Sequence, residues 1–248
     1  MNINLNQQLE QNLDYLKLPS LRDNYTELIR EAAEKQLSHL DFLSIVIADE
    51  TAAKQHRAAQ RRIKQAKFPV IKTLDQFIWS HPAKINRAQI QNIFTLNFIS
   101  QKENVIFLGN PGLGKTHLMT AIAYQACNKG HSVRFDTAVN IINRLNYAVQ
   151  NGKFSSVLRE YLSTELLCID ELGFLPIDQH GADLLFQVIS GRYERNSTMI
   201  TTNRQFNKWN EIFNNDNTIA SAILDRLLHH CEKVMIKGES FRMRAPVL

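Results

Sequence analysis

Apolar residues recur every three or four positions through the first quarter of the chain, which is the spacing of amphipathic helices. Two such series are Leu5, Leu9, Leu13 and Leu16, then Leu21, Tyr25, Leu28, Ile29 and Ala32, with Pro19 between them. Ser38 and Asp41 resemble the start of a third helix, which is expected to continue to Ala66 before Phe68-Pro69 ends it. The pattern predicts an all-helical N-terminal domain over residues 1–68.

From residue 104 onward, short apolar runs alternate with helical stretches, which indicates a parallel sheet flanked by helices. The strands are expected at 105–108, 133–136, 166–169, 199–202 and 234–236. Residues 69–103 are expected to form a connector that contains Trp79, Pro82 and a short helix over 87–98. The sequence therefore predicts an α/β domain over residues 104–248.

The first of these strands runs directly into a glycine-rich segment. Residues 109–116 fit the pattern G-x-x-x-x-G-K-[ST], which cradles phosphate groups. Gly112 and Gly114 leave the backbone amides accessible, and Lys115 supplies a cation. Thr116 opens a helix whose N-terminal amides favour an anion, and its hydroxyl is a ligand for Mg²⁺. An ordinary glycine turn is the alternative that the motif alone leaves open.

Two later strands end on polar residues that suit the same site. Asp170 and Glu171 follow the run at 166–169, where the first can hold Mg²⁺ and the second can polarise an attacking water. Asn203 follows the strand at 199–202 and can sense the γ-phosphate without adding charge. A strand can also end on a solvated acid, and Asn203 alone would be a turn residue. Together they predict a ligand site at one edge of the sheet.

The strand at 133–136 lies in sequence between the phosphate loop and the Asp170 strand, and Asn203 follows that strand. This order, together with Glu171, indicates the branch of phosphate-loop proteins that hydrolyses ATP, with ATP and Mg²⁺ as cofactors. The candidate nucleotide-binding residues are Gly109, Asn110, Pro111, Gly112, Leu113, Gly114, Lys115, Thr116 and His117.

Composition fits a cytoplasmic enzyme. The chain has 248 residues and is 44% apolar, which is enough to bury a core. Its start lacks the basic and apolar regions of an export signal, and its longest apolar stretch, 42–48, is far too short to span a bilayer. Cys127, Cys168 and Cys231 are widely separated and fit a reducing compartment.

His229 and His230 beside Cys231 suggest a zinc site. Adjacent histidines on a helix point about 100° apart, and no further ligand is expected nearby. We therefore expect no metal at this position.

The net charge of +5 conceals an asymmetry along the chain. Residues 1–50 carry four basic and nine acidic side chains, whereas residues 51–90 carry nine basic side chains and one acidic. In the second block a helical projection places Lys54, Arg57, Arg61 and Lys64 opposite His56, Ala59, Ile63 and Ala66. Such a basic stripe fits a sequence-independent, salt-sensitive contact with a nucleic-acid backbone, or else a merely solvated face.

Several segments together resemble a known family. They are K-F-P-V-I-K-T-L at 67–74, residues 109–117, I-D-E-L-G-F-L-P at 169–176, R-Y-E-R at 192–195, T-T-N at 201–203 with Trp209, and I-K-G-E-S-F-R at 236–242. This set is similar to the IstB-like helper ATPases of insertion sequences, AAA+ proteins related to the DnaC helicase loader. The resemblance covers the chain from about Leu16 to Arg244 and implies a P-loop AAA+ core behind a small helical domain.

The resemblance implies an ATPase that binds duplex DNA non-specifically, forms homo-oligomers through its ATP sites, and stimulates or targets a partner transposase. Lys115 and Thr116 would bind phosphate and magnesium, Asp170 the metal and Glu171 the water, with Asn203 as a sensor. Arg226 matches the arginine finger that AAA+ relatives insert into a neighbour's ATP site. A helix-surface arginine paired with a nearby acid is the alternative for Arg226.

Other arginines carry weaker expectations from the same resemblance. Arg242 resembles a second sensor, although such residues act from a C-terminal helical lid, for which residues 243–248 leave no room. Arg192 and Arg195 are expected to face an interface. The AAA+ domain is therefore predicted to lack the lid, which leaves the N-terminal helices as the main candidates for contact with DNA and partner.

Three functions remain open at this point. The first is an ATP-driven regulator of DNA transposition, and the second is a DnaC-like replicative helicase loader with the same core. A neighbouring reading frame for an integrase-type protein would favour the first. The third is a small-molecule P-loop kinase, against which the basic stripe and Arg226 argue.

Overall fold

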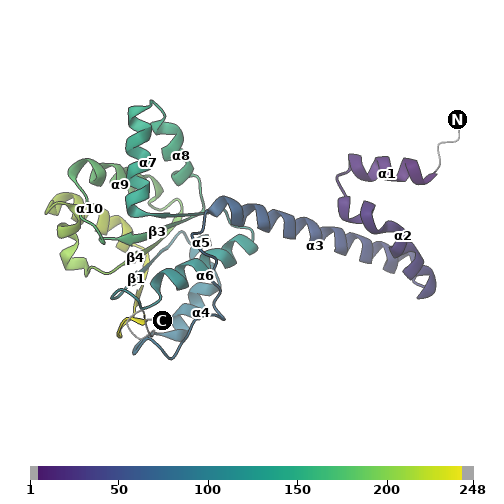
Figure 1. The fold of residues 1–248 in the computed structure, drawn as a ribbon, viewed down its shortest axis with the longest axis horizontal. Coiled ribbons are helices and arrows are strands. Elements are labelled where there is room, and N and C mark those ends of the chain that lie inside the picture. The colour runs from purple at the N-terminus through teal and green to yellow at the C-terminus, as the bar shows by residue number, and fades with distance from the viewer. Residues whose placement is uncertain (1–4, 242–248) are drawn as a thin grey trace, which may run out of the picture. The chain divides into compact units, whose positions relative to one another are not determined.

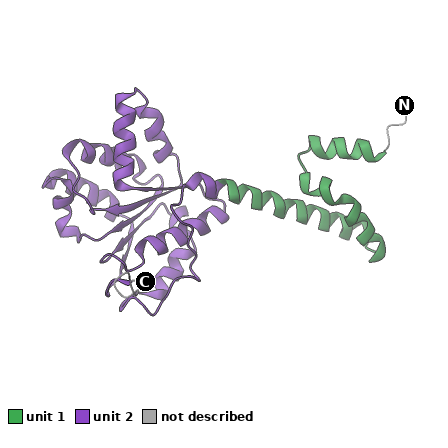
Figure 2. Ribbon diagram, viewed as in Figure 1, with its two compact units in different colours: residues 1–61 green, residues 62–248 purple. Residues whose placement is uncertain are grey.

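The computed structural model describes residues 5–241, and these divide into two compact units after Arg61 (Figure 2). The first unit consists of helices α1 (Leu5–Tyr15), α2 (Pro19–Glu34) and most of α3 (His39–Ala66) (Figure 1). Pro19 occupies the first turn of α2, where its missing N–H costs no hydrogen bond. The helical character expected for this part of the chain is confirmed.

A buried carboxylate joins α2 to α3. Glu50, whose exposed fraction is 4%, accepts hydrogen bonds from the Leu21 backbone N–H at 2.9 Å and from Arg57 at 2.8 Å. Amides in the first turn of a helix have no acceptor within that helix, so Glu50 of α3 caps α2. Although burial raises the pKa of Glu50, the bonds from Leu21 and Arg57 outweigh it, and the pKa lies below its usual value.

The second unit contains a five-stranded parallel sheet. Its strands are β1 (Asn104–Leu108), β2 (Val133–Thr137), β3 (Leu166–Leu172), β4 (Ser197–Thr202) and β5 (Cys231–Met235), in the order β2-β3-β4-β1-β5. All five expected strands are present, which confirms the predicted fold class. β5 begins at Cys231, earlier than the apolar run at 234–236 indicated.

Helices cover both faces of the sheet (Figure 1). They are α4 (Arg87–Phe94), α5 (Asn97–Ser100), α6 (Lys115–Asn128), α7 (Ala138–Gln150), α8 (Phe154–Leu162), α9 (Gln179–Arg192), the 3₁₀ helix η1 (Phe206–Phe213) and α10 (Asn217–Leu228). The helix expected over 87–98 is two helices, because Leu96 adopts a left-handed conformation with φ 69° between them.

Side-chain alternation along β1 divides the core into two layers. Val105 and Phe107 belong to a cluster with residues of α4, α5, α6 and the end of α3. Ile106, between them in the strand, belongs to a cluster with residues of α7, α9, α10 and η1. Successive strand residues point to opposite faces, so each helical layer is held by alternate positions of the same strand.

Arg192 lies within this core. Its exposed fraction is 1%, and its guanidinium donates to the backbone carbonyls of Tyr161, Thr164 and Ser197. Desolvation lowers the pKa of Arg192 to about 9. The expectation that Arg192 faces an interface is therefore wrong. Its guanidinium, carried by α9, is buried and bonds to carbonyls of α8, of the segment after α8 and of β4. Arg195 is exposed, and its role remains a prediction.

Within residues 5–241, no helix combines the length and apolar character that a crossing of a lipid bilayer requires.

Replacing Glu50 by Gln tests the contact between α2 and α3. The lowered pKa means that the ionised carboxylate contributes stability above the unfolded pKa, and that this contribution is lost as pH falls through the folded value. We expect E50Q to reduce hydrogen-exchange protection of the α2 amides at neutral pH by about 1–3 kcal/mol, and this difference from wild type to shrink as pH falls below the ordinary pKa of a glutamate and through the lower pKa of Glu50 in the folded protein.

Glu34→Gln is the matched control, because Glu34 is exposed and pairs with Arg30 on the helix surface. Surface pairs contribute little, so E34Q should leave exchange of α2 nearly unchanged. Equal effects of the two substitutions would show that Glu50 is not the residue that caps α2.

Candidate nucleotide-binding site

The candidate site lies at the carboxyl ends of β1, β3 and β4, which are neighbours in the sheet. The glycine-rich loop follows β1 and leads into α6, which begins at Lys115. The Lys115 ammonium donates to the backbone carbonyls of Gly109 at 2.7 Å and Asn110 at 2.8 Å. The lysine therefore lies across its own loop, next to the amides at the start of α6 that favour anions.

Glycine is required at two positions of this loop. Gly112 and Gly114 have φ values of +77° and +82°, which other residues rarely adopt. A Cβ atom on Gly112 would lie 2.1 Å from Ser240 Oγ, and one on Gly114 would lie 2.7 Å from a ring carbon of Phe77. The chain that follows β5 and the connector therefore both press against the loop.

Asp170 joins the loop helix to the sheet. Its carboxylate, with an exposed fraction of 5%, accepts hydrogen bonds from Thr116 Oγ1 at 2.9 and 3.1 Å. The hydroxyl of Thr201 in β4 donates to the same carboxylate. Thr116 and Asp170, the two residues that the sequence assigns to magnesium, are thus in direct contact.

Glu171 leaves the strand direction through a β-bulge. Its φ is +58°, and the pairing of β3 with β4 shifts register between Ile169 and Leu172. In a regular strand, Asp170 and Glu171 would point to opposite faces of the sheet. The bulge instead leaves Glu171 exposed at the cavity, while its backbone N–H donates to Thr201 Oγ1 at 3.0 Å.

Thr201 is a site residue that the sequence reasoning missed. Its single hydroxyl donates to Asp170 and accepts from the Glu171 amide, so it fixes both acids at once. The available signal was a hydroxyl residue near the end of a buried strand, two positions before Asn203.

A cavity of about 570 Å³ lies over the loop, within the range of pockets that bind small ligands. Its walls come from the glycine-rich loop, the ends of β3 and β4, and the connector. The lining residues are Lys72, Gln76, Phe77, Ile78, His81, Pro82, Pro111, Gly112, Leu113, Gly114, Lys115, Thr116, His117, Glu171, Phe174, Thr201, Thr202, Asn203 and Phe241. The connector wall was not predicted from the sequence.

His117 attaches the connector to α6. Its Nε2 lies 2.8 Å from the Thr73 carbonyl oxygen, and its ring packs edge-on against Phe77 with centroids 5.4 Å apart. Phe77 packs in the same way against Trp79 at 5.0 Å. These contacts form an apolar wall beside the polar loop.

Two buried polar atoms among the lining residues have no hydrogen-bond partner within residues 5–241. They are Asn203 Oδ1 and His81 Nε2. Buried polar atoms are nearly always satisfied, so such atoms at a cavity mark positions where a polar ligand group belongs. Together with the loop amides and the Thr116–Asp170 pair, they fit a nucleotide with its Mg²⁺ ion.

Arg226 does not belong to this cavity. It lies in the last turn of α10, where it donates to the Ala222 carbonyl at 2.8 Å and stacks on the Phe186 ring at 4.9 Å. It is absent from the residues that line the cavity. Arg242, the candidate second sensor, lies outside the described residues.

The basic stripe of α3 has the predicted division into two sides, with one exception. Lys54, Arg57, Arg61 and Lys64 are exposed, whereas Ala59, Ile63 and Ala66 are buried. His56, expected on the packed side, is exposed beside Gln60. Arg57 also bonds to the buried Glu50, so its charge is partly neutralised within the protein.

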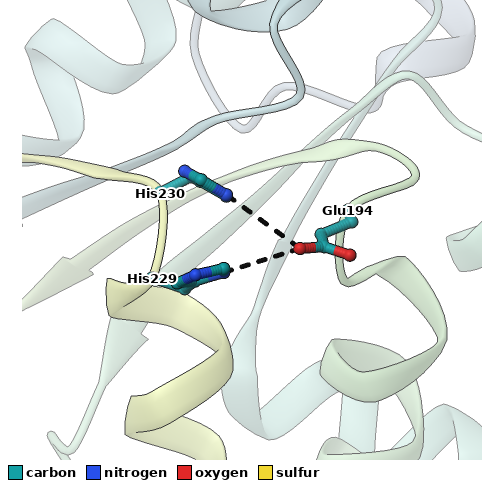
Figure 3. Close-up of side chains that lie close together, drawn as sticks. All are labelled: Glu194, His229 and His230. Carbon is teal, nitrogen blue, oxygen red and sulfur yellow. Dashed lines mark ion pairs between the residues drawn. The ribbon is translucent and has the colours of Figure 1, made fainter.

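The expectation that no further metal ligand lies near His229 and His230 is wrong. A further ligand does lie nearby in space: Glu194, from the turn between α9 and β4, faces both imidazoles (Figure 3). Its Oε1 is 3.5 Å from His229 Nδ1 and 4.0 Å from His230 Nε2.

Comparison with known proteins agrees with the site. Residues 11–247 match the model of the IstB-like ATP-binding protein family. The chain belongs to this family. It is 39% identical over 229 residues to the ATP-binding protein of insertion sequence IS5376 from Geobacillus stearothermophilus, covering 92% of this chain and 91% of that protein. It is 38% identical over 237 residues to that of IS21 from Pseudomonas aeruginosa, covering 96% and 89%.

Solved structures agree on the fold of this IstB-like protein. The DnaC helicase loader superimposes with a TM-score of 0.53 and 26% identity over 66% of this chain and 96% of that chain. DnaI superimposes with a TM-score of 0.58 and 17% identity over 67% and 91%. The core is therefore an AAA+ domain of an ATP-binding family associated with insertion sequences.

Replacing Thr201 by Val tests its role as the support of both acids. Val keeps the shape but leaves the Glu171 amide without its acceptor, a cost of about 1–3 kcal/mol, and removes one of the two hydrogen bonds to Asp170 Oδ1, which still accepts from Thr116. On the hypothesis that this site hydrolyses ATP, we expect kcat to fall at least tenfold (~1.4 kcal/mol), while affinity for ATP changes less than about threefold.

Thr201→Ser retains the hydroxyl and should retain most of the rate. Thr198→Val is the matched control on the same strand, because Thr198 bonds to Arg192 and does not line the cavity. A wild-type kcat in T201V would exclude the role given to this hydroxyl.

Proposed function

We propose that this protein is a Mg²⁺-dependent ATPase that acts on DNA as a regulator of transposition. The observation that carries the proposal is the convergence of Lys115, Thr116 and Glu171 on one cavity at the end of the sheet, with the buried Asp170 bonded to Thr116. Membership of an insertion-sequence family of ATP-binding proteins supports the same conclusion.

The residues divide the chemistry of hydrolysis among themselves. Lys115 and the loop amides bind the phosphates, and Thr116 with Asp170 would hold Mg²⁺, which would supply positive charge to neutralise the phosphate oxygens. Glu171 orients and polarises the attacking water. Asn203 contacts the γ-phosphate or that water, which would give its buried oxygen a partner.

Arg226 acts in a neighbouring subunit. Its cation is half-buried on α10 and lies away from the cavity of its own chain, so its place in catalysis requires a second copy. An arginine finger stabilises the charge that develops on the transferred phosphoryl group, typically by ~10³ to 10⁵ in rate. ATP binding would thereby be coupled to assembly of a homo-oligomer.

The basic stripe supplies the contact with duplex DNA. Its exposed cations, carried by one helix, suit phosphate groups and include no element that reads bases. Such binding does not depend on the DNA sequence. A partner transposase would therefore be directed to DNA that is already bound by the oligomer of this protein. The named relatives belong to insertion sequences, which favours this function over the loading of a replicative helicase.

Mixing two inactive variants tests the neighbouring-subunit role. E171Q retains Arg226 but cannot activate water, and Arg226→Gln retains Glu171 but lacks the finger. In random mixed assemblies about a quarter of the sites combine both intact residues. We expect an equal mixture to recover about that fraction of the wild-type ATPase rate.

Lys115→Ala mixed with E171Q is the control. Lys115 and Glu171 must come from the same chain to form one nucleotide site. No combination of the two variant subunits contains both intact residues in one chain, so the mixture should remain inactive. Recovery no greater than in this control would place Arg226 outside the neighbouring site.

Charge reversal of the stripe tests the DNA contact. The triple variant Lys54→Glu, Arg61→Glu and Lys64→Glu leaves Arg57 in place because Arg57 supports Glu50. We expect at least a tenfold loss of affinity for duplex DNA at ~0.1 M salt, and a reduction of the salt slope by about 3 in fluorescence anisotropy. ATP binding should be unchanged.

The matched control reverses three other exposed cations, Lys129, Lys153 and Arg159. Because the change in net charge is the same, any general repulsion of DNA appears equally in both variants. Equal losses of affinity would mean that the stripe is not the contact surface.

A further inference from the structure

Glu194, His229 and His230 form a cluster of potential metal ligands outside the nucleotide cavity (Figure 3). One donor atom from each lies within 4.8 Å of the others, and no other such group of three His, Cys, Asp or Glu residues occurs within residues 5–241. None of the three lines the cavity. The cluster therefore lies outside the nucleotide cavity of its own chain.

Both sides of the cluster are attached to ordered structure. His229 follows α10 and donates its backbone N–H to Asp225, while the carbonyl of His230 accepts from Asn104 at the start of β1. Glu194 has a φ of +56° in a turn whose next two amides bond to the carbonyl of Arg192. Because Arg192 is itself buried, the turn that presents Glu194 is fixed to the core.

The distances suit a divalent transition metal after small side-chain movements. Zinc binds imidazole nitrogen and carboxylate oxygen at ~2.0–2.2 Å, so tetrahedral ligand atoms lie about 3.4 Å apart. The carboxylate oxygen of Glu194 is 3.5 Å from His229 Nδ1 and 4.0 Å from His230 Nε2. The imidazole rings, with centroids 4.1 Å apart, present their nitrogens to the same oxygen.

We propose that Glu194, His229 and His230 bind a zinc-type divalent metal ion at the protein surface. Two imidazoles and one carboxylate form a ligand set that zinc uses, whereas Mg²⁺ prefers oxygen ligands alone. About half of each side chain is exposed, so the ion enters directly from solvent. Three protein ligands leave a fourth position for water or another donor.

Tyr193 competes with a metal ion for one of these ligand atoms. Its hydroxyl lies 2.8 Å from His229 Nδ1, the nitrogen that also faces Glu194. Binding of a metal to this nitrogen would replace the tyrosine hydrogen bond. The ion would then connect the turn after α9 to the end of α10, two segments more than thirty residues apart in the chain.

The experiment is a calorimetric titration of tag-removed, nucleotide-free full-length protein with Zn²⁺ in the presence of excess Mg²⁺. We expect one zinc ion per chain from this site and an increase in Tm on its addition. His230→Ala and Glu194→Gln should each weaken binding at least tenfold and abolish the Tm increase. Omission of nucleotide makes the result independent of whether the proposed ATPase function is correct.

Controls identify the ligand set. His180→Ala removes another exposed histidine, and Cys231→Ser removes the thiol that follows His230; both should bind zinc as wild type does. Tyr193→Phe removes the competing hydroxyl and should bind at least as tightly. Loss of binding in C231S or Y193F, or wild-type binding in both H230A and E194Q, would overturn the proposed site, as would absence of any saturable zinc binding.

Discussion

The geometry of the candidate site depends on the buried carboxylate of Asp170. It lies at the end of β3 and accepts hydroxyl hydrogen bonds from α6 on one side and from β4 on the other. A carboxylate in such a position is costly unless it is fully hydrogen-bonded or bound to a cation. Thr116 and Thr201 meet this requirement, and in doing so they fix the start of the loop helix relative to the two strands whose ends carry the other polar residues.

This constraint explains why short sequence motifs from distant parts of the chain form one site. The order β2-β3-β4-β1-β5 places β4 between the strand that leads into the loop and the strand that carries the acids. Thr201 in the intervening strand can therefore reach Asp170 and the Glu171 amide together. The connector closes the cavity through Phe77, which packs on His117 of α6, so a segment outside the sheet contributes its apolar wall.

Local sequence patterns were sufficient to predict the strands and the glycine-rich loop. They were insufficient where the position of a residue depends on backbone conformation or on packing against distant parts of the chain. The five strands and Gly112-Leu113-Gly114-Lys115 follow from apolar runs and glycine spacing. The break at Leu96, the burial of Arg192 and the approach of Glu194 to His229 depend on residues far away in the chain. A periodic pattern contains no information about contacts with distant residues. An arginine in a helix is therefore predicted to lie on the surface, even where backbone carbonyls surround it in the folded protein.

The bulge at Glu171 has a consequence for variation in this part of the chain. Asp170 and Glu171 take different places in the site because the backbone at Glu171 departs from the regular strand conformation. The two acids are therefore not interchangeable, even though their charges are the same. Deleting either residue between Ile169 and Leu172 would remove one of the two acids and leave the other in regular pairing with β4. The length of this segment and the identity of its two acids are therefore constrained together.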